Sequence, residues 1–344
     1  MPVTWLPAPA GTGQDGPVPV VPPKLRRGSS VRVIAPSRSL AIIGPEVRGE
    51  AERKLAALGL RVSFGEHVGE CDDFSSSPVA SRLADLHAAF ADPGVDGILT
   101  VSGGFNANQL LAGIDYALVA AHPKVLCGFA DITVLSNAVY ARAGLVGYSG
   151  PHYSSFGMKR HFEYTEAGFR ACVMDEGPVA LVPSPYWSDD AWLVDQEDRY
   201  LEQGEGWWVL QEGEAEGTIV GGSLCALNLL QGTPFMPLLA GSVVFAEDDE
   251  QVKPWDFDRD LVSVLQQPGF AGVRGLVIGR FQKATGMTRG LLAQIVASKP
   301  GLAGLPVIGN VDFGHTTPII TFPVGGTVEV RADRTAPRLT ITSH

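Results

Sequence analysis

The first candidate site in the sequence is a turn whose tip residue has no reactive side-chain atom. A short apolar run ends at Gly128, turns within two residues and enters a helix-like stretch from Thr133 to Tyr140. Hydrolases use this strand-turn-helix pattern to present a nucleophile on a tight, exposed turn. The residue at the tip is Ala130, which has neither a hydroxyl nor a thiol. The pattern therefore predicts a hydrolase-like turn that lacks its nucleophile.

Two side chains further along the chain have the residue types of triad partners. Glu247 follows an apolar run, and His315 lies in a tight turn after Gly314 that would direct its ring into a cleft. A carboxylate that orients a histidine, and a histidine that deprotonates a hydroxyl, are what a nucleophilic serine needs. The alternatives are a solvated acidic loop around Glu247 and Asp248, and a turn histidine without a catalytic role.

Backbone amides near the turn could bind a negatively charged oxygen. Gly103 and Gly104 follow a strand-like run, and their lack of side chains lets the backbone approach a ligand closely. The amide of Asp131, just after the turn tip, is in the usual position of a second donor. Two glycines after a strand are a weak signal alone, because such glycines are commonly turn residues.

These candidates lie at strand ends in an alternating pattern of strands and helices. Strand-like runs at 31–37, 61–64, 95–101 and 125–127 alternate with helix-like stretches at 47–58, 77–91 and 108–118. The alternation predicts crossover units, and hence an α/β fold with a mostly parallel sheet covered on both faces. Ligands of such sheets bind beyond the carboxyl ends of the strands, where Gly103, Gly104 and Ala130 lie.

From residue 217 the chain becomes rich in short apolar runs bounded by Gly or Pro, which predicts a second, smaller β/α domain. The sequence therefore divides into four expected segments. They are a flexible N-terminal extension at 1–25, an N-terminal α/β domain at 26–185, a connecting segment at 186–216 and a C-terminal domain at 217–344 that carries Glu247 and His315.

Composition narrows the class of protein. The chain has 344 residues, 45% of them hydrophobic and 18% charged, which indicates a globular protein of about two domains. A net charge of −11 argues against a nucleic-acid surface. No run is long and apolar enough to span a membrane, and the N-terminus has no signal-peptide pattern. We expect a cytoplasmic protein, and the acidic run after Glu247 has no nearby His or Cys to form a metal site.

Several motifs in the same order resemble those of the LD-carboxypeptidase family, and within it the microcin C immunity peptidases. The resemblance covers nearly the whole chain from about residue 30. It rests on the segments 102–111, 123–133, 148–151, 217–224, 244–248 and 314–318.

The resemblance implies a flavodoxin-like N-terminal domain and a swivelling-type C-terminal domain. It implies a serine carboxypeptidase or amidase, without a cofactor, that cleaves an amide in a murein tetrapeptide or a peptidyl-nucleotide. It also implies a homodimer. The partner that it predicts is a small peptide-like or peptidyl-nucleotide ligand, and nucleic acid and membrane are not expected.

The site residues of the family carry over one by one. Glu247 and His315 match the acid and the base, and Gly104 and Asp131 match the oxyanion donors. Ala130 stands where the family has its serine, so an acyl-enzyme is not expected. Ala130 could be an introduced Ser→Ala change or a natural feature of a protein that binds without cleaving. The intact partners favour an introduced change, and a third possibility is acid–base chemistry by Glu247 and His315 without a nucleophile.

Five further residues are candidates for substrate contact. A flat aromatic face would favour an aromatic or nucleobase group, which is why a peptidyl-nucleotide or aromatic amide is preferred to murein. The alternative for the tryptophans is packing between domains, and for the histidine a structural role. The candidates are Gly103, Asn106, His152, Trp187 and Trp192.

Overall fold

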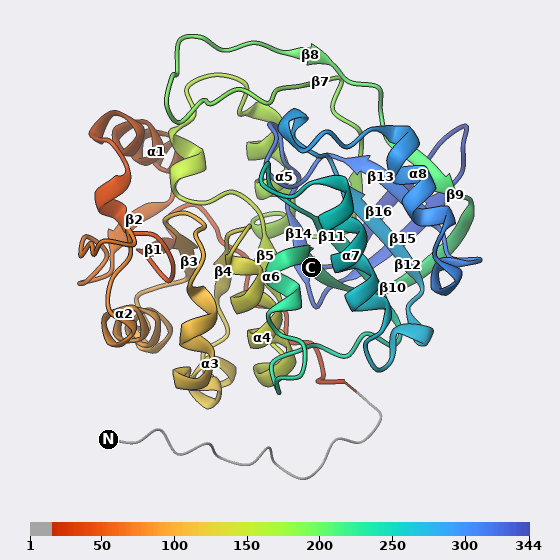
Figure 1. The fold of residues 1–344 in the computed structure, drawn as a ribbon. Coiled ribbons are helices and arrows are strands. Elements are labelled where there is room, and N and C mark those ends of the chain that lie inside the picture. The colour runs from red at the N-terminus through yellow and green to blue at the C-terminus, as the bar shows by residue number, and fades with distance from the viewer. Residues whose placement is uncertain (1–15) are drawn as a thin grey trace.

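The computed structural model describes residues 16–344, which form two β-sheets side by side (Figure 1). The strands of the first sheet are β1 (Ser30–Ile34), β2 (Arg61–Phe64), β3 (Gly97–Thr100), β4 (Val125–Cys127), β5 (Gly147–Ser149) and β14 (Phe322–Val324). Their order is β14-β5-β4-β3-β1-β2, and every pair except β14 with β5 is parallel. β3 and β4 are buried along their whole length, as expected of parallel strands covered on both faces.

Helices alternate with the strands of this first sheet. They are α1 (Pro45–Ala57), α2 (Val79–Ala91), α3 (Tyr116–Ala121), α4 (Ile132–Ala143) and α5 (Glu163–Val173). Short 3-10 turns occur at 40–42, 107–113 and 154–157.

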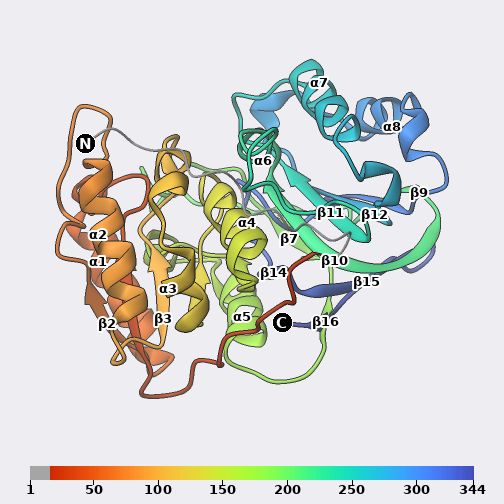
Figure 2. The same cartoon turned by 90° about the horizontal axis from the view of Figure 1, so that it is seen from below.

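The second sheet contains more antiparallel pairs. Its strands are β6 (Val179–Leu181), β9 (Trp208–Gln211), β10 (Gly213–Ser223), β11 (Ser242–Glu247), β12 (Gly275–Gly279), β13 (Val307–Val311), β15 (Thr327–Ala332) and β16 (Arg338–Ser343). The order is β6-β16-β15-β10-β11-β12-β13-β9, with parallel pairing from β10 to β13. The helices α6 (Leu224–Asn228), α7 (Pro254–Leu265) and α8 (Arg289–Ala297) gather on one side of it (Figure 2). A separate ribbon pairs β7 (Tyr186–Trp187) with β8 (Glu202–Gln203).

This architecture confirms the predicted α/β fold class, with a mostly parallel first sheet and a second β/α unit. The two sheets exchange strands. β14 comes late in the chain but pairs with β5, whereas β6 precedes residue 185, within the expected N-terminal segment, and pairs with β16. The segment boundaries expected near residues 185 and 216 therefore stay a prediction, and the pairing adds that the chain crosses between the sheets more than once.

The N-terminal extension falls partly outside the described residues, because these begin at residue 16. The part that is described packs against the fold. Val20 bridges to the segment before β5, with its amide 2.8 Å from the Gly144 carbonyl oxygen, and Leu25 is fully buried. The Lys24 ammonium donates to the carbonyl oxygens of Cys172 and His344.

Most predicted elements are observed within two or three residues of their expected ends. One is different: the helix expected at 108–118 is a 3-10 segment at 107–113 followed by α3. Asp115 separates the two, because its carboxylate accepts a hydrogen bond from the Leu118 amide and caps a new helix. Such a cap competes with continuation of the preceding turn.

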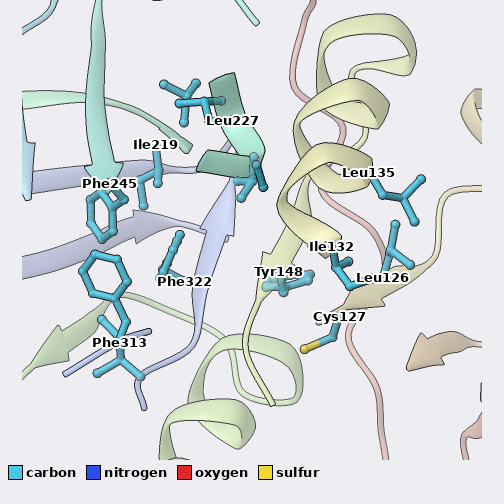
Figure 3. Packing of buried hydrophobic residues seen from close by; sticks show 14 of the residues in the cluster. Leu126, Cys127, Ile132, Leu135, Tyr148, Ile219, Leu227, Phe245, Phe313 and Phe322 are labelled. Atoms are coloured by element: carbon cyan, nitrogen blue, oxygen red, sulfur yellow. The ribbon is translucent and has the colours of Figure 1, made fainter. Parts of the chain in front are cut away.

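An aromatic cluster in the core holds two parts of the candidate site in register (Figure 3). Phe245 lies on β11 two residues before Glu247, and Phe313 lies two residues before His315. Their ring centroids are 5.5 Å apart, and Phe322 of β14 packs against both. All three rings are buried, so their packing fixes the end of β11 next to the His315 turn.

Among residues 16–344, none of the helices is long and apolar enough to cross a membrane.

Candidate active site

The turn after β4 has the backbone conformation of a nucleophile elbow. Ala130 has φ of 55°, in the left-handed region that residues other than Gly seldom adopt. The turn is closed by the Thr133 amide, which donates to the Ala130 carbonyl at 2.9 Å, and α4 begins at Ile132. Strained residues of this kind persist where the surrounding structure fixes them, typically at functional sites. The elbow is therefore intact, and a methyl group occupies its tip.

The glycine loop after β3 lies against this elbow. A Cβ placed on Gly103 would lie 2.9 Å from the Cβ of Ala130, and one on Gly104 would lie 2.1 Å from the Ser37 hydroxyl oxygen. Neither position has room for a side chain. The two glycines thus let the backbone after β3 pass directly beside residue 130.

The Asp131 carboxylate joins the elbow to the glycine loop. Its Oδ2 accepts hydrogen bonds from the Ser37 hydroxyl at 2.6 Å and from the amides of Asn106 and Ala107, each at 2.9 Å. Asp131 is buried, so these three bonds replace the water that the carboxylate loses. Sequence reasoning assigned only the backbone amide of Asp131 a role, and the structure adds this positioning role of its side chain.

The expected oxyanion donors have no competing acceptor. Within residues 16–344, neither the Gly104 amide nor the Asp131 amide donates to a protein group. Both residues line the same cavity as Ala130. Two free backbone N–H groups beside the tip of an elbow are what an oxyanion site requires.

Glu247 and His315, which the sequence suggested as an acid and a base, lie in contact. His315 Nδ1 lies 2.9 Å from Glu247 Oε2 at the end of β11. Gly314, with φ of 110°, makes the approach possible, because a Cβ there would lie 2.6 Å from that carboxylate oxygen. Glu247 is buried and lies behind the ring, whereas His315 lines the cavity with its Nε2 free of the Glu247 bond.

The carboxylates around His315 stabilise its charged form. Burial alone lowers the pKa of His315, but the charge and hydrogen bond of Glu247, with Asp249 and Asp248 behind it, outweigh burial and raise the pKa to about 9. Burial and the charge of Glu247 also raise the pKa of Asp248 to about 7. The cluster therefore holds a positive imidazole at neutral pH.

His152 is a second histidine beside the elbow. Its ring stacks on Phe129 at a centroid distance of 4.4 Å, and its Nδ1 lies 2.8 Å from the Thr100 hydroxyl oxygen. Burial and the positive charge of His315 lower the pKa of His152 to about 3, so this ring is neutral. Its Nε2 is buried without a partner among the described residues, although His152 lines the cavity.

A cavity of about 750 Å³ joins these groups. Of the residues singled out from the sequence, it contains those of the elbow, the glycine loop and the base, together with one tryptophan. They are Gly103, Gly104, Ala130, Asp131, His152, Trp192 and His315.

Asn106 and Trp187, two of the predicted substrate-binding residues, do not line this cavity. The Asn106 side chain faces the interior, where it lies 3.1 Å from a nitrogen of the Arg82 guanidinium. Trp187 contacts two cations, with Arg280 and Lys283 at 5.3 and 5.4 Å from its ring centroid. Both side chains thus contact other protein groups. For Trp187 this agrees with the alternative given above, in which the tryptophans pack against the protein and do not contact the ligand.

Several cavity residues were not identified from the sequence. Arg38, Phe105 and Phe129 line the wall near the elbow, and Ser223 and Cys225 line it near β10. Arg38 follows the first strand of a parallel sheet, so the rule that ligands bind beyond strand ends could have identified it. The same rule covers Phe105 after β3 and Phe129 after β4, whereas Ser223 and Cys225 depend on how the two sheets face each other.

Comparisons with known proteins agree with this geometry. Models of the LD-carboxypeptidase N-terminal and C-terminal domains match residues 31–150 and 216–330. A putative carboxypeptidase, YocD of Bacillus subtilis strain 168, is 47% identical over 321 residues, which cover 93% of this chain and 99% of that protein.

Solved structures have the same fold. The crystal structure of an MccF-like protein from Bacillus anthracis strain Ames is 46% identical and superimposes with a TM-score of 0.93, covering 94% of this chain and all of the other. Microcin C7 self-immunity protein MccF, solved in complex with aspartyl sulfamoyl adenosine, is 24% identical with a TM-score of 0.86. That match covers 95% of this chain and 99% of MccF, and it demonstrates a shared fold only.

Proposed function

This chain belongs to the LD-carboxypeptidase family, and we propose that its cavity is the active site of a serine-type carboxypeptidase or amidase in which Ala130 occupies the nucleophile position. The observation that carries the proposal is the left-handed Ala130 turn, which shares one cavity with the His315–Glu247 pair and two free backbone amides.

The mechanism follows from these positions once residue 130 is a serine. His315 Nε2 would take the proton of that serine hydroxyl as its oxygen attacks the scissile carbonyl carbon. The Gly104 and Asp131 amides would bind the oxygen that becomes negative. His315 would then protonate the leaving amine, and a water molecule activated in the same way would release the acyl group. Glu247 orients the ring throughout and stabilises its charged form.

With Ala130 the first of these steps has no attacking oxygen. Loss of the nucleophile in triad enzymes costs on the order of a millionfold in turnover, although binding and the oxyanion donors remain. We therefore propose that the chain as it stands binds its ligand and leaves it intact.

We propose a peptide-like or peptidyl-nucleotide ligand. The support is the cavity wall, where the half-buried Trp192 supplies a flat aromatic face in the same cavity as the elbow. MccF, which has the same fold, was solved with aspartyl sulfamoyl adenosine. Murein tetrapeptides are the second ligand class to test.

Whether Ala130 replaces an original serine divides the proposal into two forms. The intact Glu247 and His315 support an introduced Ser→Ala change, since a natural loss would leave those partners without a catalytic task. A natural Ala130 would instead make this a binding protein that sequesters a toxic peptide-like compound. The codon for residue 130 in the chromosomal gene distinguishes the two forms.

The test of catalysis is Ala130→Ser, assayed with a murein tetrapeptide and with an aminoacyl-nucleotide amide. We expect hydrolysis of at least one amide by Ala130→Ser and none by the double variant Ala130→Ser/His315→Ala, which is the matched control. If Ala130→Ser leaves every such amide intact while its fold is unchanged, the proposed function is wrong.

We further propose that the protein acts in the cytoplasm, and that it is a homodimer, as the family resemblance implies. Sedimentation equilibrium of the purified chain tests the second point, and a monomer at all concentrations would contradict it.

A further inference from the structure

Arg38 is the one lysine or arginine among the described residues that line the cavity. It follows Pro36 and Ser37 after β1, and its backbone amide donates to the Gly103 carbonyl at 3.3 Å. The Ser37 hydroxyl in turn binds the Asp131 carboxylate. The backbone of Arg38 thus contacts the glycine loop, and its neighbour Ser37 contacts Asp131. The glycine loop and Asp131 carry the two expected oxyanion donors.

The Arg38 side chain passes over the glycine loop. A Cβ on Gly104 would lie 3.0 Å from Arg38 Cγ, and the guanidinium carbon lies 4.9 Å from the centroid of the Phe105 ring. The exposed Phe105 ring gives the cation a favourable face to rest on. These contacts place the Arg38 side chain over Gly104, whose amide would bind the oxyanion, and its planar cation against the next residue, Phe105.

This cation has no partner of its own. Within residues 16–344 Arg38 forms no ion pair, and its Nε is buried without a hydrogen-bond partner. The Asp131 carboxylate, which lines the same cavity, accepts hydrogen bonds at Oδ2 from Ser37 and from the amides of Asn106 and Ala107, and none from Arg38. A buried guanidinium donor without an acceptor is costly, and an anionic ligand would relieve that cost.

The other charges on the wall favour an anion less. Asp190 is paired with Arg199 at 2.7 Å, and the charge of His315 is balanced by Glu247. Asp249 and Glu250 add negative charge on the side of β11. An anion in the cavity is therefore favoured at Arg38 and disfavoured at the opposite wall.

Bond lengths limit how far an anion on the leaving side of a substrate can lie from the oxyanion site. If a scissile carbonyl oxygen binds the Gly104 and Asp131 amides, a carboxylate carbon on the leaving residue lies within about 4 Å of the carbonyl carbon, given ordinary bond lengths. A phosphoryl group joined to the leaving nitrogen would be similarly near. Both are oxyanions that a guanidinium fork can bind with two hydrogen bonds.

We propose that Arg38 binds the oxyanion on the leaving side of the scissile amide and thereby selects ligands that carry one. This specificity role rests on the proposed function, because it uses the oxyanion site to orient the ligand. The shared chemistry is a carboxylate at a peptide end or a phosphate in a nucleotide.

The test measures equilibrium binding, since Ala130 should leave ligands intact. Calorimetry compares a murein tetrapeptide as the free acid with its C-terminal carboxamide, and AMP with adenosine. We expect the parent chain to prefer the charged member of at least one pair by about tenfold or more, the scale of a charge-assisted hydrogen bond. Arg38→Gln should abolish that preference and leave affinity for the neutral member unchanged.

Two further variants separate charge from fold. Arg38→Lys should keep part of the preference, since it keeps the charge and loses the planar fork. Arg61→Gln, at an exposed position of β2 outside the cavity, should change nothing. The responding pair identifies the anion as carboxylate or phosphate.

The outcomes distinguish the two proposals. If Arg38→Gln binds the charged and neutral members as the parent does, the role of Arg38 is wrong while the proposed function stands. If the parent binds none of the four compounds, the proposed function fails and the role of Arg38 fails with it.

Discussion

His315 Nδ1 and Glu247 Oε2 lie 2.9 Å apart, although 68 residues separate them in the chain. Glu247 is delivered by the end of β11 and His315 by a glycine turn, and the packing of Phe245 on Phe313 sets their spacing. The pair is buried on the Glu247 side and open to the cavity on the His315 side. The protonation state of His315 should therefore affect both proton transfer in the site and the free energy of unfolding.

The pH dependence of the Ala130→Ser variant should report the His315 pKa. A histidine must be neutral to accept a proton, so with a pKa of about 9 the value of kcat/KM should rise with pH up to that point. Glu247→Gln removes the charge that raises this pKa, so the rise should move to lower pH by at least about one unit. If the pH profiles of Ala130→Ser with and without Glu247→Gln coincide, this account is wrong.

The same pair should make stability depend on pH. The folded-state pKa of His315, about 9, lies above its value of 6.5 for the unfolded chain. The stabilisation is therefore complete below about pH 6.5 and is lost as pH rises through about 9. Glu247→Gln should destabilise the protein more at low than at high pH, by on the order of 2 kcal/mol.

Urea unfolding of the parent and Glu247→Gln at the two ends of this pH range measures the difference. His315→Ala is the control. It should remove the contribution of His315 to the pH dependence of the free energy of unfolding, both in the parent and in Glu247→Gln. A Glu247→Gln penalty that is the same at both ends would show that the pair does not titrate as described.

Removal of the Asp131 carboxylate should loosen the glycine loop. Asp131→Ala leaves the Ser37 hydroxyl and the Asn106 and Ala107 amides without their acceptor, which should lower the free energy of unfolding by about 2 to 4 kcal/mol. Ser37→Ala removes one of the three donors and should cost about 1 kcal/mol. Equal losses in the two variants, measured by urea unfolding, would be inconsistent with a shared acceptor.

The elbow conformation should make a glycine harmless at residue 130. Ala in the left-handed region is strained by about 1 kcal/mol, which roughly offsets the greater entropy of Gly in the unfolded chain. Ala130→Gly should therefore leave stability unchanged or raise it by up to about 1 kcal/mol. Ala88→Gly, at an exposed position inside α2, should instead lower it by about 1 kcal/mol.

Thermal unfolding of the two variants provides the comparison. The elbow would not be strained if Ala130→Gly destabilised the protein as much as Ala88→Gly does.

Much of the fold and part of the site could be predicted because they depend on local patterns. The alternation of β1 to β5 with helices follows from the period of apolar residues, and the elbow follows from an apolar strand, a tight turn and a helix. The residue types and local sequence of Glu247 and His315 by themselves indicated a triad. The split of the helix expected at 108–118 was missed, because a side-chain cap by Asp115 overrode the periodicity.

The tertiary structure decided what depends on distant segments. Asn106 was expected at the ligand and instead contacts Arg82, and Trp187 contacts Arg280 and Lys283 from the second half of the chain. The three donors on Asp131 also have no signature in any one segment.

The sequence by itself determined that an elbow without a nucleophile would be built, because hydrogen bonds and backbone angles there involve neighbours in the chain. Only the folded chain determined which charged and aromatic side chains reach the cavity. That outcome depends on how two strand-exchanging sheets pack, and the packing is set by contacts between residues far apart in sequence.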